Sequence, residues 1–303
     1  MARFTRNSYP PRLLAGPGGI ARDFLTFNLP IFSCKTFRKQ EGLNKFLNSK
    51  FGHNWELIRE LAVNDFKLKY NNSVLGYFWS LLKPLGLFGI LYMVFSVFLR
   101  MGGGDKNYPF YLLIGIMLWM FFFETTVLSM QAIVGKANLV KKIFVPKIII
   151  ILATSLTCLM TFLLNLIVFF IFMLVFGLHF HFNFILLPVY LIELYLFSFG
   201  LSLILSTLFV WFRDLAHIWE IVLQMMFYAT PIIYPVSMIP AQYQKIIFIN
   251  PVAQMIQDIR NIVLGGGQAM SSYPWLAPVA TVVLMVFGLF IFSKKSKYFA
   301  EEV

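Results

Sequence analysis

Apolar residues along this chain gather in long runs that short polar segments separate. About 20 apolar residues are needed for a helix to cross a hydrocarbon core of roughly 30 Å. By this measure six runs are predicted membrane spans: Leu81–Leu99, Tyr108–Leu128, Ile148–Phe176, Phe184–Phe212, Leu215–Tyr234 and Tyr273–Phe292. The pattern therefore predicts an all-α membrane protein whose six-helix transmembrane domain covers residues 54–299.

An amphipathic segment, Trp55–Lys69, precedes the first run. At helical spacing one face carries Leu57, Ile58, Leu61, Ala62 and Phe66, and the other carries Glu56, Arg59, Glu60 and Lys67. Such a division is typical of a helix that lies in the membrane interface. Residues 1–53 have no comparable pattern, and we expect a cytoplasmic extension that is flexible or interfacial.

The fifth run ends in ATPIIYPVSMIP, which contains Pro231, Pro235 and Pro240. Proline removes a backbone donor and clashes with the preceding helical turn, so the helix is predicted to end near Pro231. Non-helical backbone at membrane depth needs shielding by protein or by a water-filled cavity. We therefore expect residues 231–265 to re-enter the membrane edge through short helices, with an apolar extracytoplasmic loop as the alternative.

The segment 131–146, between the second and third runs, is the one sizeable internal loop on its side of the membrane. Apolar residues recur at helical spacing, and three lysines have no acidic neighbour in the sequence. A short amphipathic helix is predicted, with its ridge formed by Ile133, Ala137, Val140 and Phe144 and its charge by Lys136, Lys141 and Lys142. Docking of a cytoplasmic partner and anchoring in the interface explain this pattern equally well.

Composition supports the membrane assignment, because 59% of the 303 residues are hydrophobic and only 13% are charged. The formal charge of +12 comes from basic residues in membrane-flanking segments, which argues against nucleic-acid binding. All but four of the 25 Lys and Arg fall on one side of the six runs; the exceptions are Arg100, Lys106, Lys245 and Arg260. The positive-inside rule then predicts that both termini are cytoplasmic.

The sequence offers no catalytic group, metal site or cofactor site. Gly135-Lys136 lacks the glycine spacing of a phosphate loop, and His179 with His181 has no third ligand nearby. Glu124, Glu193 and Glu220 lie near span ends, where structural anchoring is favoured over proton relay. Ser198, Ser202 and Ser206 repeat every four residues and predict close helix packing, a polar pathway being the lesser alternative.

Five short motifs occur in order along the chain: KYNNSVLGYFWSLLKPL, NLVKKIFVPK, FRD, TPIIYP and INP. Together they resemble the permease subunit of ATP-binding-cassette polysaccharide exporters over about residues 55–299. That family exports lipid-linked O-antigen, capsule or wall teichoic acid precursors. The resemblance implies a homodimer in the cytoplasmic (inner) membrane, paired with two copies of a separate cytoplasmic ATPase that binds ATP and Mg.

The resemblance also implies roles for particular residues. The loop 131–146 becomes the coupling helix, with Ile133, Lys136, Val140, Lys141, Lys142 and Phe144 facing the ATPase. The region 231–265 becomes an exit gate that is broken at Pro231, Pro235, Pro240 and Pro251. Spans one and five would line the pathway, which makes aromatic channel candidates of Phe88, Tyr92, Phe95, Phe227, Tyr228 and Tyr234.

An undecaprenyl-type lipid-linked glycan carries a pyrophosphate that must enter from the cytoplasmic leaflet. Basic residues near the first span suit that step, and the candidates are Arg59, Lys67, Lys69 and Lys83. The alternative is that these residues have no role in binding and only reflect the general excess of Lys and Arg on the cytoplasmic side.

Three other functions of a membrane protein can be compared with these features of the sequence. A drug or small-amphiphile exporter could share the architecture, and only the motifs and the richness in aromatic residues argue against it. A secondary transporter would need midplane carboxylates and an internal repeat, and neither is evident. A membrane glycosyl- or acyltransferase would need a catalytic carboxylate or His cluster at one membrane face.

Overall fold

The computed structural model describes residues 50–70, 78–100, 107–142, 146–177, 182–265 and 274–302. The chain divides into two units, Met1–Phe46 and Leu47–Val303, and every described residue belongs to the second. Most of the predicted N-terminal extension, together with Phe144, His179 and His181, lies outside the described residues.

Helices account for nearly all of the described chain, and no strand occurs in it. The longer helices are α2 (Lys50–Tyr70), α3 (Phe78–Leu91), α4 (Tyr108–Gly135), α6 (Ile148–Val175), α7 (Leu187–Trp211), α8 (Leu215–Ala229), α10 (Pro251–Leu264) and α11 (Leu276–Lys295). Shorter ones are α5 (Ala137–Lys142), α9 (Ala241–Ile247) and α12 (Phe299–Glu302). A π-helical segment, η1 (Tyr92–Phe98), continues α3, and 3₁₀ turns lie at η2 (Phe182–Leu186), η3 (Val236–Met238) and η4 (Ser296–Tyr298).

Five of these helical stretches are long and apolar enough to cross a bilayer: Leu81–Phe98, Tyr108–Gly135, Ile148–Val175, Asn183–Trp211 and Leu276–Tyr298. The predicted fifth run, 215–234, is different. It divides into α8, whose 15 residues extend about 22 Å at 1.5 Å per residue, and a turn that begins at Thr230. The helix ends at Ala229, two residues before Pro231, as the loss of a backbone donor predicts.

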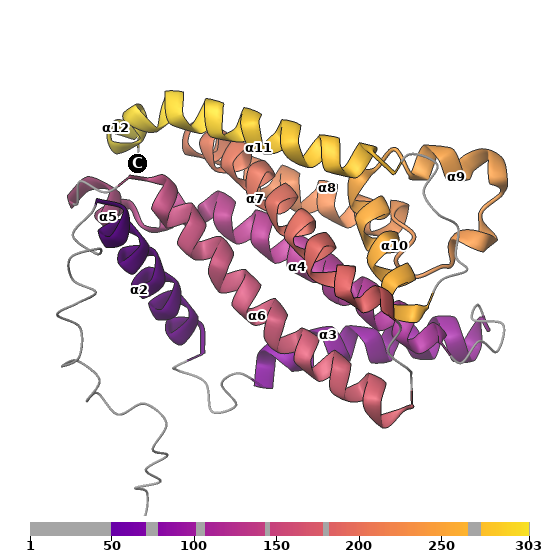
Figure 1. Cartoon of the computed structure of the whole chain (residues 1–303). Coiled ribbons are helices and arrows are strands. Elements are labelled where there is room, and N and C mark those ends of the chain that lie inside the picture. The colour runs from indigo at the N-terminus through magenta and orange to yellow at the C-terminus, as the bar shows by residue number, and fades with distance from the viewer. Residues whose placement is uncertain are drawn as a thin grey trace, which may run out of the picture. The chain divides into compact units, whose positions relative to one another are not determined.

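Helix α4 forms the centre of the unit. It packs against α3, α6, α7, α8 and α10, and near its N-terminus Tyr108 and all residues from Phe110 to Trp119 are buried. Figure 1 shows α4, α6, α7 and α11 running side by side. Because the core surrounds one long apolar helix, the spans are held in register by packing along their length.

The closest helix pair is α7 with α11. A Cβ added to Gly288 would lie 2.5 Å from the carbonyl oxygen of Gly200, and one added to Gly200 would lie 2.9 Å from the backbone nitrogen of Met285. On α7, Ser198, Ser202 and Ser206 are completely buried. The hydroxyl of Ser202 donates to the carbonyl oxygen of Thr125 in α4 at 3.3 Å, so the predicted close packing along the serine repeat is confirmed against α4.

The predicted amphipathic helix is α2, and it packs against α6 with its apolar face. Ala62 is completely buried, and the hydroxyl of Thr157 donates a hydrogen bond to its carbonyl oxygen at 3.1 Å. Arg59 and Lys67 are exposed on the opposite face. In Figure 1 α2, α5 and α12 lie towards one end of the bundle, and α9 and α10 lie towards the other.

Candidate functional site

A charged cluster joins the amphipathic helix to the first two spans. Lys69 of α2 and Lys83 of α3 both donate to the carboxylate of Glu124 in α4, at 3.2 and 3.5 Å. Two cations therefore share one anion, and the cluster keeps a net positive charge. The structure brings together two of the four predicted entrance residues here, while Arg59 and Lys67 stay on the outer face of α2.

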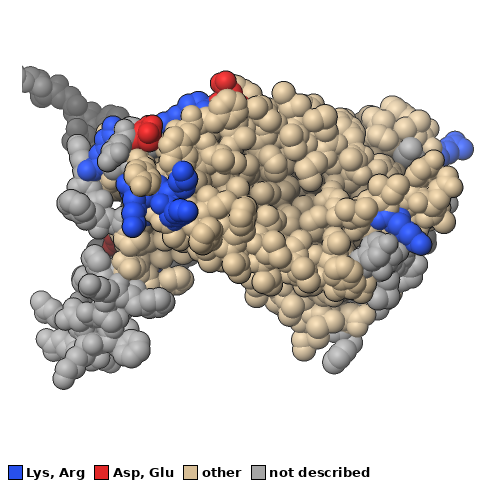
Figure 2. All heavy atoms as spheres, turned by 90° about the horizontal axis from the view of Figure 1, so that it is seen from above, with Lys and Arg blue, Asp and Glu red and all other residues tan. Residues whose placement is uncertain are grey.

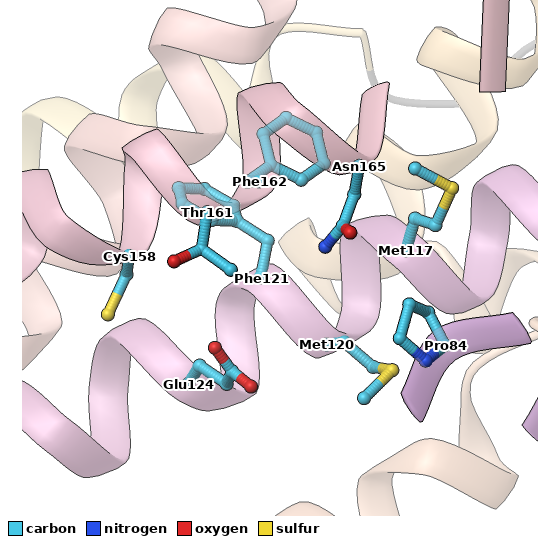
Figure 3. A pocket seen from close by; sticks show the side chains of 9 residues that line it. All are labelled: Pro84, Met117, Met120, Phe121, Glu124, Cys158, Thr161, Phe162 and Asn165. Atoms are coloured by element: carbon cyan, nitrogen blue, oxygen red, sulfur yellow. The ribbon is translucent and has the colours of Figure 1, made fainter. Parts of the chain in front are cut away.

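A small cavity of about 20 Å³ lies beside this cluster, between α3, α4 and α6. In Figure 3, Glu124 of α4 lies across from Thr161 and Asn165 of α6. The lining residues are Pro84, Met117, Met120, Phe121, Glu124, Cys158, Thr161, Phe162 and Asn165. The side-chain oxygen of Asn165 is buried and has no hydrogen-bond partner within the described chain. One ordered water molecule fits such a space and would satisfy that oxygen.

A larger apolar cavity, of about 320 Å³, lies between α3 with η1, the N-terminal end of α4 and the C-terminal end of α6. Its walls are Leu85, Phe88, Tyr92, Pro109, Phe110, Leu113, Phe172 and Phe176. Phe88 and Tyr92 stack with ring centroids 5.6 Å apart and face α4 rather than the exposed side of α3. Phe95, further along η1, likewise packs against the core.

The remaining aromatic channel candidates do not form one surface with these. Phe227 packs on Trp119 of α4, with centroids 5.9 Å apart. Tyr228, the next residue, is 63% exposed. Tyr234 lies in the turn after α8 and donates its hydroxyl to the carbonyl oxygen of Tyr228 at 3.1 Å. Of the six candidates, Tyr228 therefore presents its ring most openly.

The proline-containing turn 230–235 is held by side chains from other helices. Arg260 of α10 is completely buried, and its guanidinium donates to the carbonyl oxygens of Tyr111, Pro231 and Ile232 at 3.0, 2.6 and 2.7 Å. The same guanidinium lies over the Tyr111 ring, 3.6 Å from its centroid. Two backbone acceptors of the turn are thus satisfied by one planar cation.

Two tyrosines of α4 complete this arrangement. Tyr108 donates its hydroxyl to the carbonyl oxygen of Ile233 at 2.8 Å, and Tyr111 donates its hydroxyl to the carbonyl oxygen of Tyr234 at 3.2 Å. Asn250 caps α10 by accepting from the backbone N–H of Val252 at 3.0 Å, while its amide donates to the Thr230 hydroxyl at 3.2 Å. The turn is therefore a fixed element that joins α4, α8 and α10.

The predicted gate prolines each lie at a break. Pro231 is buried in the turn, and Pro235 precedes η3. Pro240 caps α9, and Pro251 begins α10. From the sequence, Arg260 stands out only as one of the four basic residues on the far side of the spans, and its burial and its partners follow from the fold.

The loop 131–146 differs from the predicted exposed ridge. Its first residues continue α4, and α5 is only six residues long. Ile133 and Val140 are buried in the chain's own core with Phe199, Phe292 and Phe299, so they cannot also meet a partner in this arrangement.

The charges of the loop also need a correction. Lys136 has no acidic neighbour in the sequence, but it pairs with Asp65 of α2. Asn138 and Lys141 are exposed on α5, whereas Phe144 and the side chain of Lys142 lie outside the described residues. Among the described side chains of α5, those of Asn138 and Lys141 are therefore the ones open to a partner, and both are polar.

Among the described residues, no group of three His, Cys, Asp or Glu side chains comes together to hold a metal ion. The geometry is that of a helical membrane unit with a basic cluster at one end and a fixed, non-helical turn at the other.

Known proteins support this picture. The ABC-2 type transporter family matches residues 56–264. The O-antigen export system permease protein RfbA of Klebsiella pneumoniae is 32% identical over 253 residues, which are 82% of this chain and 96% of the relative. The protein of the same name from Myxococcus xanthus is 27% identical over 250 residues, covering 82% and 95%.

A less similar relative is named for the transport of a different polysaccharide. The polysialic acid transport protein KpsM of Escherichia coli is 24% identical over 242 residues, which cover 79% of this chain and 93% of the relative.

Proposed function

This chain belongs to the ABC-2 type transporter family, and on that premise we propose that it is the membrane subunit of an ATP-driven polysaccharide exporter. The observation that carries the proposal is the match with O-antigen export permeases over almost their whole length. The proposed cargo is a lipid-linked glycan on an undecaprenyl-type carrier. Two copies of the chain would form the channel, and two copies of a cytoplasmic ATPase would bind ATP and Mg.

The six-span topology is part of this proposal, and contacts between α8 and α4 support it. Trp219 donates its indole N–H to the hydroxyl of Thr126 at 3.2 Å, and Phe227 packs on Trp119 further along. The Tyr111 hydroxyl then lies 3.3 Å from the carbonyl oxygen of Pro231. Helix α8 thus follows the membrane-spanning α4 in the opposite direction, which fits a short fifth span.

The charged cluster at Glu124 fits an entrance for the lipid pyrophosphate. Lys69 and Lys83 retain an excess positive charge beside α2, at the end of the bundle that carries most of the basic residues. Anionic headgroups are attracted to such clusters at the cytoplasmic surface. Arg59 and Lys67 on the outer face of α2 would extend the attraction along the interface.

The opposite end supplies the proposed gate. The turn after α8, with α9 and α10, would open and close the exit, because it joins the fifth span to a helix that does not cross the membrane. Arg260 and the two tyrosines would keep the turn in shape while α8 moves.

Energy would enter through α5. Its exposed residues Asn138 and Lys141 are proposed to contact the ATPase, while Ile133 and Val140 connect α5 rigidly to the core. Closure of the ATPase dimer would then displace the bundle through this connection. No cofactor is assigned to the chain itself.

Co-purification tests the partner. The wild-type chain is expected to retain its cognate ATPase through affinity purification in mild detergent. Lys141→Glu should weaken the association at least tenfold because it reverses a charge at the docking surface. Lys294→Glu, which reverses an exposed charge on α11, is the matched control and should retain the ATPase. Loss of the ATPase from both variants, or from neither, contradicts docking at α5.

Deletion of the gene tests the cargo. Cells without this chain are expected to accumulate lipid-linked glycan inside and to lose it from the surface, and re-expression should reverse both effects. If surface glycan stays normal while sensitivity to small amphiphiles rises, the drug-exporter alternative is correct instead.

A further inference from the structure

The apolar cavity of about 320 Å³ lies inside the membrane-spanning part of the unit. Its walls come from α3 with η1, from the N-terminal end of α4 and from the C-terminal end of α6, and all three belong to candidate spans. Tyr108, the neighbour of the wall residue Pro109, donates its hydroxyl to Ile233 of the proline-containing turn. The cavity therefore lies at the depth of the bilayer, towards the end of the unit that carries this turn.

The walls of the cavity are hydrocarbon apart from one group. Among the residues that line it, Tyr92 carries the one polar side-chain atom, and this hydroxyl makes no hydrogen bond within the described chain. An ordered water molecule needs two to four polar partners, and a cavity of about 150 Å³ lined by Leu, Ile and Phe stays dry and binds benzene. The present cavity has roughly twice that volume. Its occupant is therefore apolar.

Lipid can reach the cavity from the side. Phe176, which lines it just beyond the end of α6, is 70% exposed. On the opposite wall, Met93 and Val97 follow the lining residue Tyr92 and are exposed as well. The rim of the cavity is thus apolar and borders the space that acyl chains fill.

The first span is irregular beside the cavity. At Tyr92 the α-helix changes into the π-helical η1, none of whose seven residues is buried, and Arg100 beyond it has φ of 51°. π-Helical segments are rare and often mark functional sites, and a left-handed backbone is uncommon for arginine. Since little protein packs on η1, a chain held in the cavity would support this end of the span.

We propose that the cavity holds an acyl chain of a glycerophospholipid and that the Tyr92 hydroxyl donates a hydrogen bond to the ester carbonyl of that lipid. A methylene group has about the volume of a water molecule, roughly 30 Å³, so the cavity accommodates about ten carbons of one chain. Arg100, two residues after η1 and exposed, supplies a cation for the phosphate of the headgroup. The inference concerns a resident membrane lipid and does not rest on the proposed export function.

The lipid carrier of a cargo is a poorer occupant. The lysines that suit its pyrophosphate meet at Glu124, which lies 15 residues beyond Pro109 along α4, or about 22 Å at 1.5 Å per residue. No residue of α8 lines the cavity, so it is separate from a pathway between the first and fifth spans. An isoprenoid chain also has no ester carbonyl, and the Tyr92 hydroxyl would remain without an acceptor.

A photoreactive lipid tests this inference. The full chain, with the subunits that it retains in mild detergent, is placed in nanodiscs of phosphatidylethanolamine and phosphatidylglycerol. A small share of the phosphatidylethanolamine carries a diazirine in the middle of one ester-linked acyl chain, and mass spectrometry locates the residues that it labels. Label is expected at Leu113, which is only 4% exposed, as well as at lipid-facing residues such as Ile171.

A variant with a filled cavity provides the comparison. Leu85→Trp should lower the labelling of Leu113 about tenfold, because the indole takes the space of the acyl chain. Ile171→Trp, at a position that is 53% exposed on α6, is the matched control and should leave this labelling unchanged. Leu113→Phe fills the same cavity from α4 and is read at Phe88, so it replaces Leu85→Trp if that variant does not fold.

Three results would overturn the proposal. Label at Ile171 but none at Leu113 would show that the cavity is closed to lipid, for example by a second copy of the chain. Equal labelling of Leu113 in the wild type and in Leu85→Trp would show that the label arrives by another route. Loss of label when undecaprenyl phosphate replaces an equal amount of unlabelled phospholipid would identify the carrier as the occupant.

Tyr92→Phe tests the hydrogen bond. It removes only the hydroxyl and should lower the labelling of Leu113 by about two- to tenfold, as expected for one hydrogen bond. An ether-linked probe lacks the ester carbonyl and should label the wild type and Tyr92→Phe equally. Equal labelling of both proteins by the ester-linked probe, or a difference with the ether-linked one, would refute this contact. Labelling needs neither glycan nor ATP, so its failure would leave the proposed function untouched.

Discussion

At the scale of single residues, the decisive feature is a buried cation whose partners are backbone carbonyls. Arg260 gives three hydrogen bonds to carbonyl oxygens and lies on the ring of Tyr111. Gly115 makes room for it, because a Cβ there would lie 1.8 Å from a guanidinium nitrogen. The prolines of the turn are tolerable since this side chain donates to the carbonyl oxygens of Pro231 and Ile232, while Tyr108 donates to that of Ile233.

Substitution of Arg260 is expected to destabilise the turn. Arg260→Gln leaves the carbonyl oxygens of Pro231 and Ile232 without their donors, at a cost of about 3 kcal/mol, or roughly 5–10 °C in the unfolding midpoint. The unfolding midpoint of Arg260→Lys should lie between those of the wild type and Arg260→Gln, because one ammonium group cannot reach all three acceptors. Thermal unfolding in detergent measures both, with the exposed Lys245→Gln as control. Equal midpoints for all variants would contradict the role given to Arg260.

At the scale of elements, helix length and helix contact are set by different residues. Pro231 ends α8, and Pro251 with Asn250 begins α10, so these boundaries are local in origin. The α7–α11 contact instead depends on two glycines 88 positions apart in the sequence, whose backbones touch. Neither helix requires glycine in order to form. Each glycine is required because the backbone of the neighbouring helix leaves no room for a Cβ.

Alanine substitutions separate these two effects. Gly288→Ala should lower stability by about 1–3 kcal/mol, because its Cβ would lie 2.5 Å from the Gly200 carbonyl oxygen and push the helices apart. Gly89→Ala on α3 has nothing within 4 Å of the new Cβ and should be neutral or stabilising, since alanine favours helices by up to about 1 kcal/mol. Unfolding midpoints that fall equally for both would argue against close α7–α11 packing.

At the scale of the whole described unit, charge is divided between its ends. On the face shown in Figure 2, Lys and Arg gather mainly at one end, a few lie at the other, and the long middle shows no charged side chains. This division agrees with the sequence, in which all but four of the 25 Lys and Arg fall on one side of the predicted spans. It favours placing the end with α2, α5 and α12 in the cytoplasm.

Reporter fusions test this orientation. Green fluorescent protein fused after Val303 should fluoresce, and alkaline phosphatase at the same site should be inactive, because the C-terminus is expected inside. Fusions after Gly265, at the other end of the unit, should give the opposite pair of results. Phosphatase activity of the fusion after Val303 would show that the C-terminus lies outside the cytoplasm and would contradict this orientation.

The sequence by itself determined the class of protein, most of the spans, the amphipathic α2 and the breaks at Pro231 and Pro251. These depend on composition, on helical periodicity and on the missing proline donor, which act within a few residues. The motifs also indicated the family to which the chain belongs. The roles predicted for single residues stay predictions, and their positions could be placed only in three dimensions.

Tertiary structure alone decided which partners these residues meet. It paired Lys136 with Asp65, buried Val140 in the core, turned Phe88 and Tyr92 towards α4, and joined Lys69 and Lys83 at Glu124. Arg260 reaches a carbonyl 149 positions away in the sequence. Such contacts depend on how whole helices rotate and pack against one another, and that arrangement leaves no periodic pattern within either segment.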